Sequence, residues 1–108
     1  MTKKFTHEVI FCIVNIGYSE MVMDAAREAG AYGGTVIHAK GTGMEAAEKF
    51  MGVHLASEKE LIYIVVKTAQ KNDIMQAIMS KAGTSTKAKA IVFSLPVTDT
   101  AGLRLVED

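Results

Sequence analysis

The stretch that decides the fold is residues 33–43, which read Gly-Gly-Thr-Val-Ile-His-Ala-Lys-Gly-Thr-Gly. Its middle part, Thr35 to Ala39, predicts a strand, because threonine, valine and isoleucine suit a pleated, half-buried surface. Gly41 and Gly43 follow, and glycine tolerates positive φ and lets the backbone pass close to another group. The stretch therefore predicts a strand that ends in a sharp bend or a close backbone approach.

The segment after this strand, residues 42–58, shows no alternating pattern of apolar and polar residues. Met44, Ala47, Phe50 and Met51 could share a short helical face. Roughly fifteen residues of loop are long for a small domain, because ordinary connections have about 4–6 residues. This length indicates either a functional loop or a disordered one.

Three further runs rich in apolar and β-branched residues predict strands at 9–14, 61–66 and 90–95. The only proline of the chain, Pro96, ends the last of these strands or places it at a sheet edge.

Two segments predict helices. Residues 19–29 repeat apolar side chains at helical spacing, with Ser19 as the expected N-cap and Gly30 at the position after the C-terminus. A second helix is expected to begin at a cap, Asn72 or Asp73, and to end at Gly83.

The elements therefore follow the order β-α-β-β-α-β, which is the ferredoxin-like arrangement of the α+β class. We expect an antiparallel four-stranded sheet with both helices on one face. The strands at 9–14 and 61–66 are apolar on both faces, although the helices can cover only one. An exposed apolar face implies a partner, and the simplest partner is the same chain in a closed ring.

Composition excludes several classes of protein. The 108 residues fit a single domain over 1–108, and the net charge of zero argues against nucleic-acid binding. Cys12 is the only cysteine, so a buried, packed thiol and a reducing compartment are expected. The N-terminus lacks an apolar signal core, and the run at 9–14 is far shorter than the ~20 residues that span a bilayer. These observations predict a cytoplasmic protein.

Lysines and glycines are the candidates for anion binding. Open glycine amides can form an anion-binding nest, and nearby ammonium groups can neutralise phosphate oxygens. The candidates are Lys40-Gly41-Thr42-Gly43 and the pair Lys87 and Lys89. The spacing matches neither the dinucleotide GxGxxG nor the P-loop motif, so a simple bend after the strand is an equal alternative.

Other catalytic and metal patterns are not recognisable. His7, His38 and His54 lack metal-ligand spacing, so no metal site is expected. Acylphosphatases share this order of elements, but they need an arginine-bearing anion loop after the first strand, where this chain has Asn15-Ile16-Gly17-Tyr18. We therefore do not expect an enzyme.

The sequence resembles the PII family of signal-transduction proteins over nearly its whole length. Gly34-Thr35-Val36-Ile37 leading into Lys40-Gly41-Thr42-Gly43 is similar to the family's second strand and its Lys-Gly-x-Gly exit into the long T-loop. Lys59 precedes Ile62-Tyr63-Ile64-Val65-Val66, where the family places a lysine ahead of Ile-Glu-Ile-Val-Val. The helix that ends at Gly83 and the turn before Ile91 match the family's B-loop region in position.

The resemblance implies a homotrimer that binds an adenine nucleotide (ATP, ADP, AMP or a cyclic form) in clefts between subunits. Its T-loop, residues 42–58, would report the ligand to a partner such as a membrane transporter or an enzyme. The nucleotide-binding positions implied are Thr35, Lys40, Gly41, Thr42, Gly43, Lys59, Gly83, Thr86, Lys87 and Lys89. The positions implied for partner binding are Met44, Glu45, Phe50, Met51 and His54.

The chain also departs from the family pattern. Met44-Glu45 stands where the family has Gln-Lys, which argues against magnesium and 2-oxoglutarate sensing. The segment 85–90 replaces the B-loop's Gly-Asp-Gly-Lys, and Arg104 alone remains of the paired C-terminal arginines. These departures keep two alternatives open. One is a trimer that senses another small anion, such as bicarbonate, or only docks a protein. The other is a small enzyme of the same fold.

Overall fold

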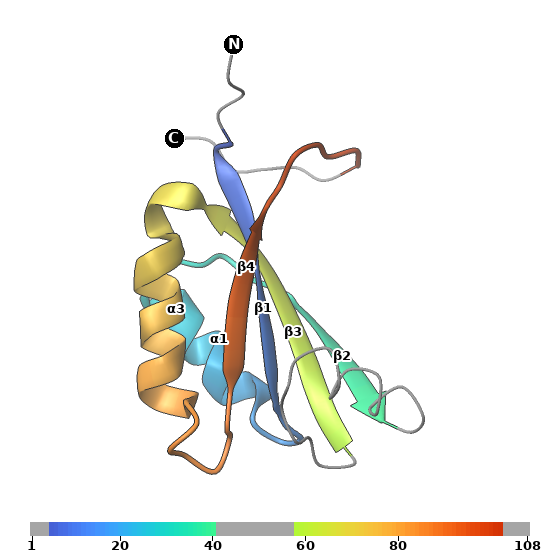
Figure 1. The fold of residues 1–108 in the computed structure, drawn as a ribbon, viewed down its shortest axis with the longest axis vertical. Helices are drawn as coiled ribbons and strands as arrows, with labels where there is room; N and C mark the ends of the chain where they lie inside the picture. Colours follow the sequence, from blue (N-terminus) through green and yellow to red (C-terminus); the bar gives the residue numbers. More distant parts are fainter. Residues whose placement is uncertain (1–4, 41–57, 103–108) are drawn as a thin grey trace.

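The computed structural model describes residues 5–40 and 58–102, which form one sheet and two helices (Figure 1). The elements in chain order are β1 (His7–Asn15), α1 (Ser19–Glu28), β2 (Thr35–Lys40), β3 (Glu58–Lys67), α3 (Thr68–Ala82) and β4 (Ile91–Pro96). The four strands are antiparallel, in the order β2-β3-β1-β4. Both helices cover the same face of the sheet, so the expected ferredoxin-like fold is confirmed.

The core lies between this face and the helices. Every second residue of β1 is buried there (Ile10, Cys12 and Val14), as the two-residue period of a strand requires. Ile62, Ile64 and Val66 of β3, Val22 of α1, and Ile74 and Ile78 of α3 complete its centre. Burial raises the pKa of the Cys12 thiol to about 12. The thiol therefore stays protonated and packs as a small hydrophobe, as expected.

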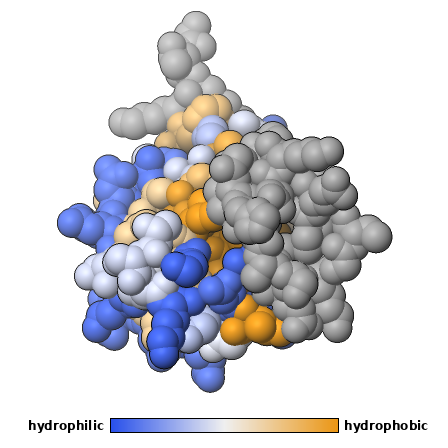
Figure 2. All heavy atoms as spheres, turned by 60° about the horizontal axis from the view of Figure 1, so that its bottom comes forward, coloured by the Kyte–Doolittle hydropathy of each residue, from blue (hydrophilic) through white to orange (hydrophobic). Residues whose placement is uncertain are grey.

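The opposite face of the sheet is also apolar, although no helix of the described chain covers it. It carries Val9, Phe11 and Ile13 of β1, Leu61, Tyr63 and Val65 of β3, and Ile91, Phe93 and Leu95 of β4. The Phe11 ring stacks on Phe93 with centroids 5.3 Å apart and lies 6.1 Å from the Tyr63 ring. Hydrophobic surface also forms a band in the view from the lower end of the molecule (Figure 2). We call the residues listed above the open face.

The two ends of α1 show one correction and one confirmation. The N-cap residue is Tyr18 rather than Ser19, and its side chain makes no capping hydrogen bond. At the other end, Gly30 has φ +115°, and the amides of Gly30 and Ala31 donate to the carbonyls of Arg27 and Ala26. This is the Schellman arrangement, which places glycine after the helix C-terminus.

The second helix begins earlier than expected, at Thr68 rather than at Asn72 or Asp73. The amide of Thr68 donates to the carbonyl of Thr6 at 2.9 Å, so contact with the start of β1 fixes the first turn. Residues 68–71 carry mostly polar side chains, which give no apolar period to reveal a helix. Gly83 closes the helix as expected, and a Cβ at this position would collide with the carbonyl oxygen of Met79.

β1 and β3 extend beyond the apolar runs that predicted them, and β4 is shifted by one residue from 90–95 to Ile91–Pro96. β1 reaches Asn15, and β3 already begins at Glu58, which removes Glu58 from the expected loop. Ladder hydrogen bonds continue through these polar residues because pairing with a neighbouring strand needs only their backbones. Pro96 belongs to β4, which is an edge strand, in agreement with its missing amide donor.

Gly34 provides a test of how closely β2 approaches the core. A Cβ on Gly34 would lie 2.7 Å from Cγ1 of Ile64 and 2.9 Å from the carbonyl oxygen of Tyr63, whereas a Cβ on Gly33 would meet nothing within 4 Å. Gly34→Ala should therefore lower the free energy of unfolding by about 1–3 kcal/mol through overpacking. Urea denaturation at one protein concentration measures it, with Gly33→Ala as the control. Equal midpoints for the two variants would contradict the close approach.

Candidate functional site

One end of the sheet gathers the ends of all four strands. β1 and β2 end there, and β3 and β4 begin there, at the bottom of Figure 1. In the strand register Asn15 lies opposite Lys59, and Lys40 lies opposite Glu58. The same end therefore carries the exit of β2 toward residues 41–57 and the connection 83–90 that leads into β4.

Two neighbouring charged residues of β3 are buried at this end. Lys59 is 5% exposed and Glu60 is 4% exposed. Successive residues of a strand point to opposite faces, so Lys59 lies on the side of the open face and Glu60 on the side of the helices. A buried charge is costly unless polar groups satisfy it, and each of the two has such partners on its own side.

The partner of Lys59 is Asn15. The Lys59 ammonium donates to Oδ1 of Asn15 at 2.5 Å, and Nδ2 of Asn15 donates to the carbonyl of Lys87 at 2.8 Å. The amide of Asn15 also donates to the carbonyl of Ala88 at 2.9 Å. Asn15 thus joins the buried lysine of β3 to the connection that precedes β4.

Lys89 brings a second ammonium group close to Lys59. The pKa of Lys59 is lowered, first by burial and second by the positive charge of Lys89. Lys89 has φ +51°, which is uncommon for a residue other than glycine. Among the described residues, the partner of the Lys59 ammonium is a neutral amide rather than a carboxylate. An anion bound between the two lysines would attract both ammonium groups and favour the charged form of Lys59. The geometry therefore suits anion binding.

The connection 83–90 is held by its own hydrogen bonds. The amide and the hydroxyl of Thr86 both donate to the carbonyl of Gly83, at 2.9 and 2.7 Å. The amide of Ala90 donates to the carbonyl of Ala82 at 2.7 Å. Ala88 and Ala90 are buried, and Lys87 and Lys89 are exposed. The loop therefore presents its lysines to solvent from a fixed backbone.

Glu60 satisfies its charge at the start of α1. Its Oε1 accepts from the amides of Gly17 at 3.0 Å and Ser19 at 3.2 Å, so a side chain of β3 caps the helix. The helix dipole favours a carboxylate at this position. Nε2 of His38 lies 3.5 Å from Oε2, although the His38 side chain is largely exposed. Sequence reasoning missed Glu60, and the polar Lys-Glu pair ahead of an apolar strand was the available signal.

Comparison with known proteins identifies the family. The family model described as nitrogen regulatory protein P-II matches residues 8–107. The chain belongs to this family. P-II proteins are regulatory signalling proteins rather than enzymes, and they bind small effector molecules.

Two solved structures share the fold of this P-II protein. Arabidopsis thaliana PII bound to citrate is 24% identical, with a TM-score of 0.65 over 87% of this chain and 79% of that chain. A functionally unknown protein from Pediococcus pentosaceus is 12% identical, with a TM-score of 0.63 over 93% of this chain and 100% of that chain. At these identities the likeness shows the fold alone. No curated protein matches.

The structure brings some of the expected nucleotide-binding positions together. Lys59, Gly83, Thr86, Lys87 and Lys89 lie at the lower end of the sheet or in the connection beside it. Lys40 ends β2 at the same end.

Other expected positions lie elsewhere. Thr35 is at the far end of β2, opposite Tyr63, about 16 Å along the strand from Lys40. Within one chain Thr35 therefore does not meet the lysines. The positions that fall outside the described residues are Gly41, Thr42, Gly43, Met44, Glu45, Phe50, Met51 and His54.

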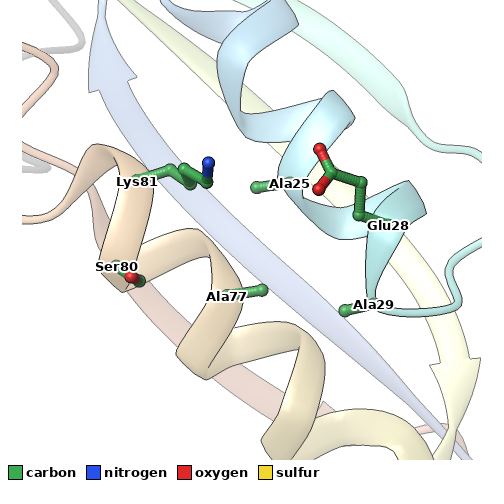
Figure 3. A pocket seen from close by; sticks show the side chains of 6 residues that line it. All are labelled: Ala25, Glu28, Ala29, Ala77, Ser80 and Lys81. Atoms are coloured by element: carbon green, nitrogen blue, oxygen red, sulfur yellow. The ribbon is translucent and has the colours of Figure 1, made fainter.

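A separate hollow of about 260 Å³ lies between α1 and α3 of the P-II chain. Figure 3 shows Ala25, Ala29 and Ala77 facing one another across it, with Glu28 and Lys81 on opposite helices. Three alanines form its centre, and Glu28, Ser80 and Lys81 complete its lining. Among the described residues, no three His, Cys, Asp or Glu side chains are grouped to hold a metal. Within the same residues, no helix combines the length and the apolar character needed to cross a bilayer.

The capping role of Glu60 can be tested by Glu60→Gln, which keeps the shape of the side chain but removes its charge. Charge-assisted hydrogen bonds are stronger than neutral ones, so the free energy of unfolding should fall by about 1–2 kcal/mol. Chemical denaturation at neutral pH measures it. Glu28→Gln is the control, because Glu28 is exposed on α1. If both variants are as stable as the wild type, the buried carboxylate does not hold α1.

Proposed function

We propose that this P-II protein binds an adenine nucleotide in clefts between three subunits and controls a partner protein through residues 42–58. The observation that carries the proposal is the pair of ammonium groups, Lys59 and Lys89, at the end of the sheet from which residues 41–57 depart. A bound anion there would lie next to the base of the loop. Ligand binding and loop conformation would then be linked.

The phosphates of a nucleotide suit this pair of lysines. Charge-assisted contacts to phosphate oxygens are strong, and burial makes the attraction between Lys59 and an anion stronger than at an exposed site. We also assign Lys40, Gly41, Gly43 and Lys87 to the proposed site, as the resemblance to the family implies. Thr35, at the far end of β2, would join it only from a neighbouring subunit.

The open face supports the proposed trimer. It bears half-buried aliphatic and aromatic side chains across β3, β1 and β4. Lys59 and Asn15 lie on the same side of the sheet at its lower edge, so subunits packed through this face would form clefts beside the lysines. Such a cleft could hold the base and sugar while the lysines hold the phosphates. We further propose that the protein acts in the cytoplasm and controls its partner there.

The second candidate is a trimer that binds a smaller anion, and the connection 83–90 favours it. The amides of Thr86 and Ala90 already donate to carbonyls of the same chain. Fewer backbone donors are then left to hold a chain of phosphates. The citrate held by Arabidopsis PII is a small polycarboxylate of this kind.

The turn after β1 argues against the alternative of an enzyme with an acylphosphatase-like anion loop. In an acylphosphatase-like site, the turn after the first strand would bind the substrate anion. Here the amides of Gly17 and Ser19 in this turn are taken by the carboxylate of Glu60. A carboxylate at this position would also repel a substrate anion.

Calorimetry with ATP, ADP, AMP and cyclic nucleotides tests the site. Lys59→Met should weaken nucleotide binding by about tenfold or more, since it removes one buried charge-assisted contact. Lys71→Met is the matched control, because Lys71 pairs with Glu8 at 3.5 Å, near the opposite end of β1. If no nucleotide binds below millimolar concentration while citrate or bicarbonate does, the second candidate replaces the first.

Light scattering tests the trimer. The wild type should have three times the mass of the chain, and Phe11→Asp should be monomeric because it places a charge at the centre of the open face. Tyr32→Asp is the control, since Tyr32 is 72% exposed and lies outside the sheet. A monomeric wild type at micromolar concentration would overturn the quaternary part of the proposal.

A further inference from the structure

The side chain of Asn15 hydrogen-bonds to both parts of the lysine site. It ends β1, lies opposite Lys59 in the register, and bonds Lys59 on one side and the carbonyl of Lys87 on the other. Its backbone amide adds a third bond, to the carbonyl of Ala88. The two lysines of the site come from β3 and from the connection 83–90, and Asn15 is the direct link between these segments.

The chemistry of this link requires an amide. The side chain must accept a hydrogen bond from an ammonium and donate one to a carbonyl at the same time, and asparagine carries both an acceptor oxygen and a donor NH₂. An aspartate at this position could accept but not donate, and its charge would repel the carbonyl oxygen of Lys87. An apolar residue could do neither.

The neutrality of Asn15 matters as much as its geometry. A carboxylate would pair with the Lys59 ammonium and cancel the charge that a ligand needs. Within residues 5–40 and 58–102, the amide orients the ammonium without placing a carboxylate beside it, and burial first and the charge of Lys89 second lower the pKa of Lys59. The site is thereby held ready for an anion from outside the chain.

We propose that Asn15 is the positioning residue of the anion site: its amide fixes the Lys59 ammonium and the backbone at residues 87 and 88 in one frame while leaving the charge free for a phosphate-type oxyanion. This inference rests on the proposed function in so far as it assumes that an anion binds between Lys59 and Lys89. It goes beyond that function because it assigns a role to a residue that need not touch the ligand.

The test uses Asn15→Asp and Asn15→Ala in the full-length protein. Asn72→Asp is the matched control, since it makes the same chemical change at an exposed position on α3. The probes are ATP and inorganic tripolyphosphate, titrated by calorimetry. The second readout is the pKa of Lys59 from NMR of its side chain, and circular dichroism checks that each variant is folded.

The inference predicts a specific pattern. Asn15→Asp should raise the pKa of Lys59 and weaken tripolyphosphate binding by tenfold or more. Asn15→Ala should weaken it several-fold without introducing a charge, and Asn72→Asp should change neither quantity. The rise in the Lys59 pKa shows only that position 15 contacts the ammonium. A merely structural role would lower the stability of Asn15→Ala without the several-fold loss of tripolyphosphate affinity. If Asn15→Asp does not fold, Asn15→Ala alone tests the proposal: a several-fold loss of tripolyphosphate affinity supports it, and unchanged affinity contradicts it.

The outcomes separate the two proposals. If wild type binds ATP and both Asn15 variants bind it equally well, the positioning role is wrong and the proposed function stands. If wild type binds tripolyphosphate in an Asn15-dependent way but no nucleotide, the nucleotide proposal is wrong and the positioning role stands. If wild type binds neither probe, there is no anion site for Asn15 to organise, and both are overturned.

Discussion

The carboxylate of Glu60 is almost completely removed from water, and its contacts determine how the lower end of the molecule is built. A buried charge is tolerated only with well-placed partners, and here the partners are two amides at the start of α1. The carboxylate therefore ties β3 to the turn after β1 and orients the helix that covers the core. His38 of β2 faces the same carboxylate, two residues before the strand ends at Lys40.

Lys59 shows the opposite solution to the same problem. Its neighbour Glu60 is hydrogen-bonded to amides at a helix terminus, whereas Lys59 is hydrogen-bonded to a neutral amide and has a second lysine nearby. The period of the strand separates the two charges onto opposite faces, so they cannot simply pair. One buried charge thus holds the fold, and the other lies on the open-face side, where we propose that an anion binds. In this proposal, adjacent residues at the start of β3 have a structural and a binding role.

Local signals in the sequence were sufficient for most of the fold. Apolar runs located the four strands, Gly30 marked the end of α1, and Pro96 marked an edge strand. Each of these patterns depends only on residues that are close together in the sequence, so it can be recognised without knowing the fold. The start of α3 was misplaced because its first turn is fixed by the carbonyl of Thr6, which is distant in sequence. The N-cap of α1 was misplaced for the same reason.

The candidate site was only partly predictable. Lys87 and Lys89 were predicted from their residue type and position, and Lys59 through the resemblance to P-II proteins, but the residues that bond to them were not predicted. Asn15 and Glu60 act on partners more than forty residues away in sequence, and no periodicity encodes such pairs.

A polar residue at a strand end has too many possible roles for its type alone to select one. For Asn15 the deciding fact is that an acceptor and a donor of one amide meet two different segments of the chain. The contact with Lys59 depends on where β1 ends relative to the start of β3. The contact with Lys87 depends on where β1 ends relative to the start of β4. The sheet topology therefore carries information about the site that the order of elements does not. Two P-II chains with the same element order could differ in anion binding through the residue that ends β1 alone.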